Sequence, residues 1–103
     1  PSPTYPPEAV LLGMTGYVYA EYTVLADGTT GNLMALASSS PLFERTAFET
    51  IEQYRYLPAQ AEGKSVATGN IKTLIVFGDV PEENLPLTEG AVERLTVSMP
   101  DAP

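Results

Sequence analysis

The sequence lacks both cysteine and histidine. Without cysteine, disulfide bonds, thiolate metal sites and cysteine nucleophiles are all excluded. Without histidine, the commonest general base and the commonest metal ligand are missing as well. An enzyme built on this chain would depend on carboxylates, lysine and tyrosine alone. We therefore expect a protein that is not an enzyme and that needs no cofactor and no metal ion.

Basic residues are scarce, because five lysines and arginines stand against thirteen aspartates and glutamates, for a net charge of −8. A chain this acidic has no electrostatic attraction for nucleic acid or for an anionic membrane face. No apolar run is long enough to span a membrane. Since the sequence begins on Pro-Ser-Pro rather than Met, we expect a piece of a longer protein whose anchor lies upstream.

The 103 residues have the length of one small domain, and ten of them are prolines. Residues 1–7, PSPTYPP, are typical of the extended end of a proline-rich linker. Residues 8–14, EAVLLGM, predict a short helix. Glu8 suits the positive end of that helix, and Gly13 offers a C-terminal stop.

The clearest local signal lies in residues 17–37, where two strand-like runs flank Asp27-Gly28. This dipeptide between alternating runs is the strongest short cue for a β-hairpin, and we interpret it as turn chemistry alone. Leu33 and Ala35 lie on the core side of the return strand. On the first strand the alternation places one set of side chains in the core: Val18, Ala20, Tyr22 and Val24.

A second helix is predicted to begin at Pro41, with Ser40 as its N-cap. Its apolar stripe consists of Phe43, Ala47, Phe48, Ile51 and Tyr54. Proline disfavours helical geometry in the residue before it, so Leu57-Pro58 prevents continuation. We expect the helix to end with Tyr54 and Tyr56 near its final turn, where both aromatic rings pack onto the sheet.

Residues 61–64 then predict a turn, and residues 65–77 predict one long strand in which Gly69 marks a bulge or bend. The last segment, residues 80–103, carries five acids against one base. Two interpretations of this acidic extension stay open: a disordered tail, or a short extra strand formed by ERLTVSM, residues 93–99. Such a strand would dock on the edge of residues 70–77, within one molecule or between two.

The order of these elements is α-β-β-α-β. It predicts an α+β fold, a two-layer sandwich in which a three-stranded antiparallel sheet packs against two helices. The division that we expect is a linker end at residues 1–7, a domain at 8–79, and the acidic extension at 80–103.

In this order and spacing, residues 3–77 resemble the C-terminal domain of TonB-type energy transducers. The matching pieces are YPPEA, Gly13 and Gly16, YVYAEYTVLADGT, SSS, LFERTAFETIEQYRYLPA and EGK. The chain departs from the family's pattern in its acidity, in its continuation beyond the last strand, and at Ser2, where the best-known members have Gln.

The resemblance implies a periplasmic domain that is tethered by a proline-rich linker to an inner-membrane anchor. The implied partners are outer-membrane transporters for siderophores, cobalamin or similar nutrients, and a proton-channel complex of the ExbB/ExbD type that acts on the upstream part. The transporter's TonB-box peptide adds as an extra strand to the sheet. This leaves monomer and strand-exchanged homodimer open.

Carried over to this sequence, the peptide-binding edge is the last strand, and the segment before the first helix supplies further contacts. The residues are Ser2, Pro3, Tyr5, Asn70, Ile71, Lys72, Thr73, Leu74, Ile75, Val76 and Phe77. The alternative is a structural or regulatory domain of the cell envelope with a TonB- or TolA-like fold, which self-associates or binds another protein. The upstream sequence would separate the two, since a single anchor and a long proline-rich linker favour the transducer.

Overall fold

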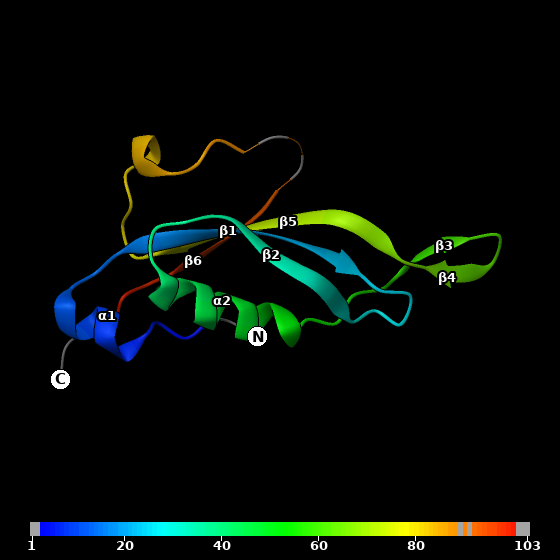
Figure 1. Ribbon diagram of the computed structural model, residues 1–103, viewed down its shortest axis with the longest axis horizontal. Coiled ribbons are helices and arrows are strands. Elements are labelled where there is room, and N and C mark those ends of the chain that lie inside the picture. Colours follow the sequence, from blue (N-terminus) through cyan, green and yellow to red (C-terminus); the bar gives the residue numbers. More distant parts are fainter. Residues whose placement is uncertain (1–2, 89, 91, 101–103) are drawn as a thin grey trace.

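The structure is a computed structural model that describes residues 3–88, 90 and 92–100 (Figure 1). The elements in chain order are α1 (Pro7–Leu12), β1 (Gly16–Val24), β2 (Thr30–Ser38), α2 (Pro41–Glu52), β3 (Ala59–Ala61), β4 (Lys64–Val66), β5 (Thr68–Phe77), the 3₁₀ turn η1 (Glu82–Asn84) and β6 (Glu93–Val97). Four strands form the main sheet in the order β2-β1-β5-β6, and β3 and β4 form a separate hairpin. Among the described residues no helix is long and apolar enough to cross a membrane.

The predicted α+β architecture is confirmed, and of the two interpretations left open for the acidic extension the structure shows the extra strand, so the sheet has four strands and is mixed rather than three-stranded and antiparallel. β1 pairs antiparallel with β2 and with β5, as expected. β6 then adds a fourth strand that runs parallel to β5, which makes the sheet mixed. A parallel neighbour needs a crossover connection of a dozen or more residues, and residues 78–92 provide one.

Both helices contribute to one core on the same face of the sheet (Figure 1). The buried members of this main core are Tyr5, Ala9, Val18, Ala20, Tyr22, Val24, Phe43, Ala47, Ile51, Ile75 and Phe77. The alternation predicted for β1 is therefore confirmed, because all four of its predicted core residues belong to this cluster. Leu33 of β2 packs against the cluster from the rim.

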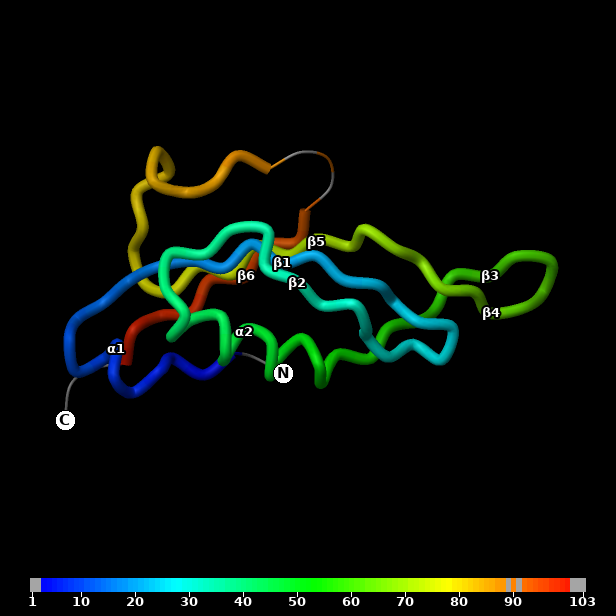
Figure 2. Tube along the Cα trace, in the orientation of Figure 1, coloured from blue at the N-terminus to red at the C-terminus, as the bar shows by residue number. Residues whose placement is uncertain are grey.

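The opposite face of the sheet carries a second, smaller cluster of buried side chains: Tyr19, Leu74 and Val76. Val80, Leu85 and Val92 pack against it from the connection between β5 and β6. In Figure 2 this connection passes over the face opposite α2. The sheet is thus covered on both sides, in part by the chain that leads to β6.

Helix α2 begins as predicted. Ser40 is its N-cap and accepts a hydrogen bond from the backbone N–H of Leu42 at 3.3 Å, while Pro41 takes the first helical position. The helix ends at Glu52, so Tyr54 and Tyr56 follow its final turn closely, as predicted, but Tyr54 is not part of the helical stripe. Beyond Gln53 the chain is not helical, and the two aromatic rings pack against the main core from this segment.

The predicted long strand of residues 65–77 is divided between β4 and β5. The turn lies at Glu62-Gly63, where both residues have positive φ values of 52° and 78°. The bulge predicted near Gly69 is confirmed by the register, because Tyr22 pairs with Ile71 whereas Val24 pairs with Thr68. Three steps on β5 therefore oppose two on β1, and Asn70 takes up the extra residue with a φ of 58°.

Candidate peptide-binding edge of strand β5

The candidate site is the outer edge of β5, the side that faces away from β1. We call residues 70–77 along this side the β5 edge. β6 pairs with residues 73–77 of this edge, in a register from Thr73 opposite Glu93 to Phe77 opposite Val97. In the described part of the chain, residues 70–72 have no strand partner on the outer side.

Burial changes along the strand at the same point. Residues 73–77 are all buried, with at most 5% of any of them exposed. Asn70 is exposed, and Ile71 and Lys72 are half-buried. The β5 edge thus consists of an open end, residues 70–72, and a covered end, residues 73–77.

The side chains of the covered end are committed to the protein's own interior. Ile75 and Phe77 belong to the main core, whereas Leu74 and Val76 belong to the second cluster. The hydroxyl of Thr73 forms a hydrogen bond of 2.9 Å with the hydroxyl of Tyr22. The covered end can therefore offer a partner its backbone N–H and C=O groups, which is what strand addition requires.

The N-terminal residues predicted to contact a peptide lie beside the end of this strand. Ser2 lies outside the described residues, and Pro3 is buried. Tyr5 is also buried, and its hydroxyl donates a hydrogen bond to the carbonyl oxygen of Met14. The Tyr5 ring packs edge-on against Phe77, with centroids 5.7 Å apart. Burial raises the pKa of the Tyr5 hydroxyl, so this side chain stays neutral.

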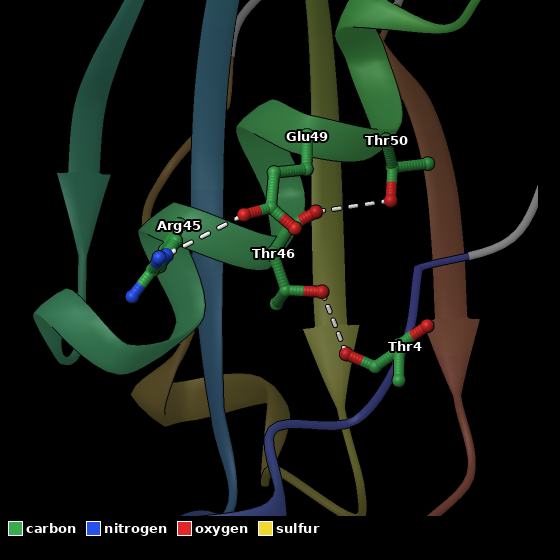
Figure 3. A network of polar contacts seen from close by, with 5 residues as sticks. All are labelled: Thr4, Arg45, Thr46, Glu49 and Thr50. Carbon is green, nitrogen blue, oxygen red and sulfur yellow. Dashed lines mark hydrogen bonds and ion pairs between the residues drawn. The ribbon is translucent and has the colours of Figure 1, made fainter.

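A small polar network attaches the N-terminal segment to α2 (Figure 3). The hydroxyl of Thr46 donates to the carbonyl oxygen of Thr4 at 2.6 Å, and the hydroxyl of Thr50 donates to the carbonyl oxygen of Thr46 at 2.9 Å. On the same helix, Arg45 and Glu49 form an exposed ion pair at 3.4 Å. The chain before α1 is therefore held against α2 and delivers Tyr5 to Phe77.

The segment after α2 lies near the boundary between the open and covered ends. The hydroxyls of Tyr22 and Tyr56 are 2.5 Å apart, which links the segment to Tyr22 and through it to Thr73. A hollow of about 210 Å³ is lined by Tyr54, Arg55, Tyr56 and Glu93. Burial, and secondarily the carboxylate of Glu93, raises the pKa of Tyr54 to about 12. Sequence reasoning placed the tyrosines on the sheet but did not place them beside the first residue of β6.

The Asp27-Gly28 turn has a second role that the interpretation as turn chemistry alone missed. Asp27 accepts hydrogen bonds from Thr29, and these lower the pKa of its carboxyl group. Gly28 also accepts a hydrogen bond from the N–H of Tyr56 at 2.8 Å. A Cβ atom on Gly28 would lie 2.3 Å from the carbonyl oxygen of Tyr56. The hairpin turn therefore positions the segment that carries the two tyrosines.

β6 is held at both faces of the sheet. Leu95, Val97 and Met99 pack against the main core. The N–H of Gly78 donates to the carbonyl oxygen of Val97 at 2.8 Å, which continues the parallel ladder. Arg94 forms an ion pair with Glu82 at 2.8 Å, and this hydrogen-bonded contact lowers the pKa of the Glu82 carboxyl group.

The model of the family described as "Gram-negative bacterial TonB protein C-terminal" matches residues 1–77 of the sequence. The chain belongs to this TonB family. Its structure is similar to the solution NMR structure of the Pseudomonas aeruginosa TonB C-terminal domain, with a TM-score of 0.65. The two sequences are 27% identical, and the match covers 74% of this chain and 77% of that one. A TonB2 protein from Vibrio anguillarum is similar in fold, at 22% identity and a TM-score of 0.57, over 73% of this chain and 72% of that one. None of the curated proteins compared with the chain matches it.

The TonB family match ends at Phe77, which is also the last residue of β5. The part of the chain that covers the β5 edge therefore lies outside the match. Within the TonB domain the β5 edge would be the free edge of the antiparallel sheet, and β6 occupies it from a segment that this match does not include.

Proposed function

We propose that this domain binds the TonB-box peptide of outer-membrane nutrient transporters along the β5 edge, by strand addition. The domain would act in the periplasm as the receptor-engaging end of a transducer whose upstream part is anchored in the inner membrane and driven by a complex of the ExbB/ExbD type. Through this grip it would transmit energy derived from the proton-motive force for uptake of nutrients such as siderophores. The single observation that carries the proposal is that residues 73–77 already hold an added strand, β6, as a backbone ladder.

The geometry suits a contact made chiefly by backbone groups. Alternate residues of the β5 edge direct their N–H and C=O groups to the outer side, and at residues 73–77 the side chains are buried in the protein's own interior. Each hydrogen bond of such a ladder contributes only about 0.5–1.5 kcal/mol net. A peptide paired along several residues shares a pulling force over all of these bonds, which is what transmission of mechanical energy needs.

The residues have separate roles in this proposal. Asn70, Ile71 and Lys72 present the open end, and residues 73–77 present the ladder that β6 occupies now. Pro3 and Tyr5 are buried, so they would act by positioning the end of β5, through the contact of Tyr5 with Phe77. Ser2, the first residue of this segment in the proposed site, would contact the peptide directly.

The test is an NMR titration of the full chain with synthetic TonB-box peptides from transporters of the source bacterium. We expect amide shift changes to concentrate on residues 70–77 and on β6. Two matched peptides sharpen the result: one carries N-methyl groups on the alternate residues whose N–H groups face β5, and the other carries them on the remaining residues. Only the first should lose binding. Shift changes confined to β2, the other edge of the main sheet, would overturn the proposal.

A further inference from the structure

We infer that β6 is a built-in competitor for the β5 edge, and that a peptide partner starts pairing at residues 70–72 and then displaces β6. This inference rests on the proposed function and adds its regulation. The observation behind it is that the β5 edge has an open end, residues 70–72, directly beside a covered end that begins at Thr73.

The covering strand is shorter than the edge that it covers. β6 pairs with five positions of β5, from Thr73 to Phe77. An incoming peptide in extended conformation has eight positions available, residues 70–77. Three of those eight are open before β6 moves, so the peptide can form its first backbone bonds there without removing any existing bond.

The two ends of β6 are held unequally. Toward its C-terminal end, Leu95, Val97 and the following Met99 pack against the main core. At its N-terminal end, Glu93 is exposed and borders the hollow beside Tyr54 and Tyr56. Displacement that starts at residues 70–72 therefore meets the less buried end of β6 first.

Covalent attachment gives β6 an advantage that a free peptide lacks. A segment joined by a short connection competes at an effective concentration in the millimolar range. The apparent affinity for a peptide is lowered by the fraction of molecules in which the edge is free. A peptide that pairs with all eight positions gains contacts at residues 70–72 that β6 does not make, and these offset the advantage of β6. A peptide that pairs only with residues 73–77 gains no such contacts.

The first experiment weakens β6 in the full chain with one proline. The carbonyl oxygen of Val97 accepts from Gly78, and the alternation along the strand then directs the N–H of Leu95 toward β5 and that of Thr96 toward solvent. Leu95→Pro therefore removes a bond to β5, while Thr96→Pro serves as the matched control on the outer edge. We expect Leu95→Pro to tighten binding of the TonB-box peptide at least about tenfold, which is the gain if the edge is free in about a tenth of the unmodified molecules or fewer. Thr96→Pro should change the affinity less than about threefold.

The second experiment strengthens β6 reversibly. Val76 and Thr96 are register partners on β5 and β6, and the chain has no native cysteine, so the double variant Val76→Cys/Thr96→Cys contains one pair of thiols only. The oxidised form, with β6 tied to β5, should lose binding of the same peptide. Addition of a reducing agent should restore it. The single variant Val76→Cys controls for the changed side chain and should not respond to the reducing agent.

The outcomes separate this inference from the proposed function. Tighter binding by Leu95→Pro together with loss of binding in the oxidised double variant supports both. Equal binding by all forms, the oxidised one included, overturns the inference and also the assignment of residues 73–77 to the peptide, while recognition of the TonB-box peptide by this domain stands. Absence of binding in every form, including Leu95→Pro and the reduced double variant, overturns the proposed function itself and the inference with it.

Discussion

The two clusters of buried side chains on the main sheet differ in how they are covered. The main core lies between the sheet and both helices, and it draws on segments from Tyr5 to Phe77, all within the family match. The second cluster, on the opposite face, is covered by side chains from the connection to β6. The buried residues of the main core therefore lie within the family match, whereas the second cluster is covered by the connection to β6. β6 itself packs against the main core through Leu95 and Val97, so both clusters hold the extension in place.

The largest expected effect comes from the main core. Phe43 is fully buried, and its ring stacks on that of Phe77 with centroids 4.7 Å apart. Phe43→Ala should lower the free energy of unfolding by about 3–5 kcal/mol, since the ring is lost and a cavity remains. Denaturant unfolding followed by circular dichroism measures this. Leu57→Ala is the control, because Leu57 is 97% exposed and its loss should change stability by less than about 0.5 kcal/mol.

A smaller effect is expected from the polar link inside the main core. Tyr22→Phe removes the hydroxyl that bonds both Tyr56 and the buried Thr73, so it should lower the free energy of unfolding by about 1–3 kcal/mol. Tyr17→Phe, in a side chain that packs with the second cluster, should cost less than about 0.5 kcal/mol. Equal effects of the two substitutions, measured by the same denaturant titration, would contradict the distinction between the clusters.

The third prediction concerns alkaline pH and Tyr54, which packs against the main core and lies beside Glu93, the first residue of β6. The pKa of Tyr54 in the folded protein is about 12, above its ordinary value of 10.0. The folded state therefore holds this proton more tightly than the unfolded state, and the stabilisation is fully present below pH 10 and is lost as the pH rises toward 12. Thermal unfolding midpoints should fall over this range, and they should fall less steeply in Tyr54→Phe. Parallel pH profiles for the two proteins would show that Tyr54 makes no contribution.

The smallest effect is expected from the ion pair of the C-terminal extension. Arg94 and Glu82 are both substantially exposed, so Arg94→Gln should leave global unfolding unchanged within error. Its effect should appear locally, as faster amide hydrogen exchange at the residues of β6 with no change in β1. A drop in the global thermal midpoint comparable to that of Tyr22→Phe would mean that the extension and the main core unfold as one unit.

Prediction from the sequence succeeded where the signal is local. The alternation of β1, the Ser40 cap and the bulge near Gly69 each depend on a few neighbouring residues, and all three are confirmed. The place of Tyr54 outside α2 and the separate β3–β4 hairpin were missed. At the end of α2 tertiary contacts decided, since Tyr56 is held by Gly28 and by Tyr22 rather than by the helix. The β3–β4 hairpin is instead local, because its strands pair across the turn at Glu62-Gly63.

The candidate site was also predicted in part from the sequence and settled in part only by the structure. The family resemblance predicted residues 70–77 as the peptide-binding edge, and the sequence left open whether residues 93–99 form a strand. The structure places β6 on that edge but leaves residues 70–72 unpaired there within the described chain. It also buries Tyr5 in the main core, which a segment of four prolines in seven residues does not indicate.

By itself, the sequence determined the order of the two helices and the first two strands and the core face of β1, because periodicity, caps and turn dipeptides act over short distances. The run of its motifs also indicated the TonB family. Only the tertiary structure decided that the extension passes over the opposite face of the sheet and returns as a parallel strand. That choice depends on the fit of Val80, Leu85 and Val92 onto the second cluster and of Leu95 and Val97 onto the main core. Such contacts join residues far apart in the chain, and no local pattern specifies them.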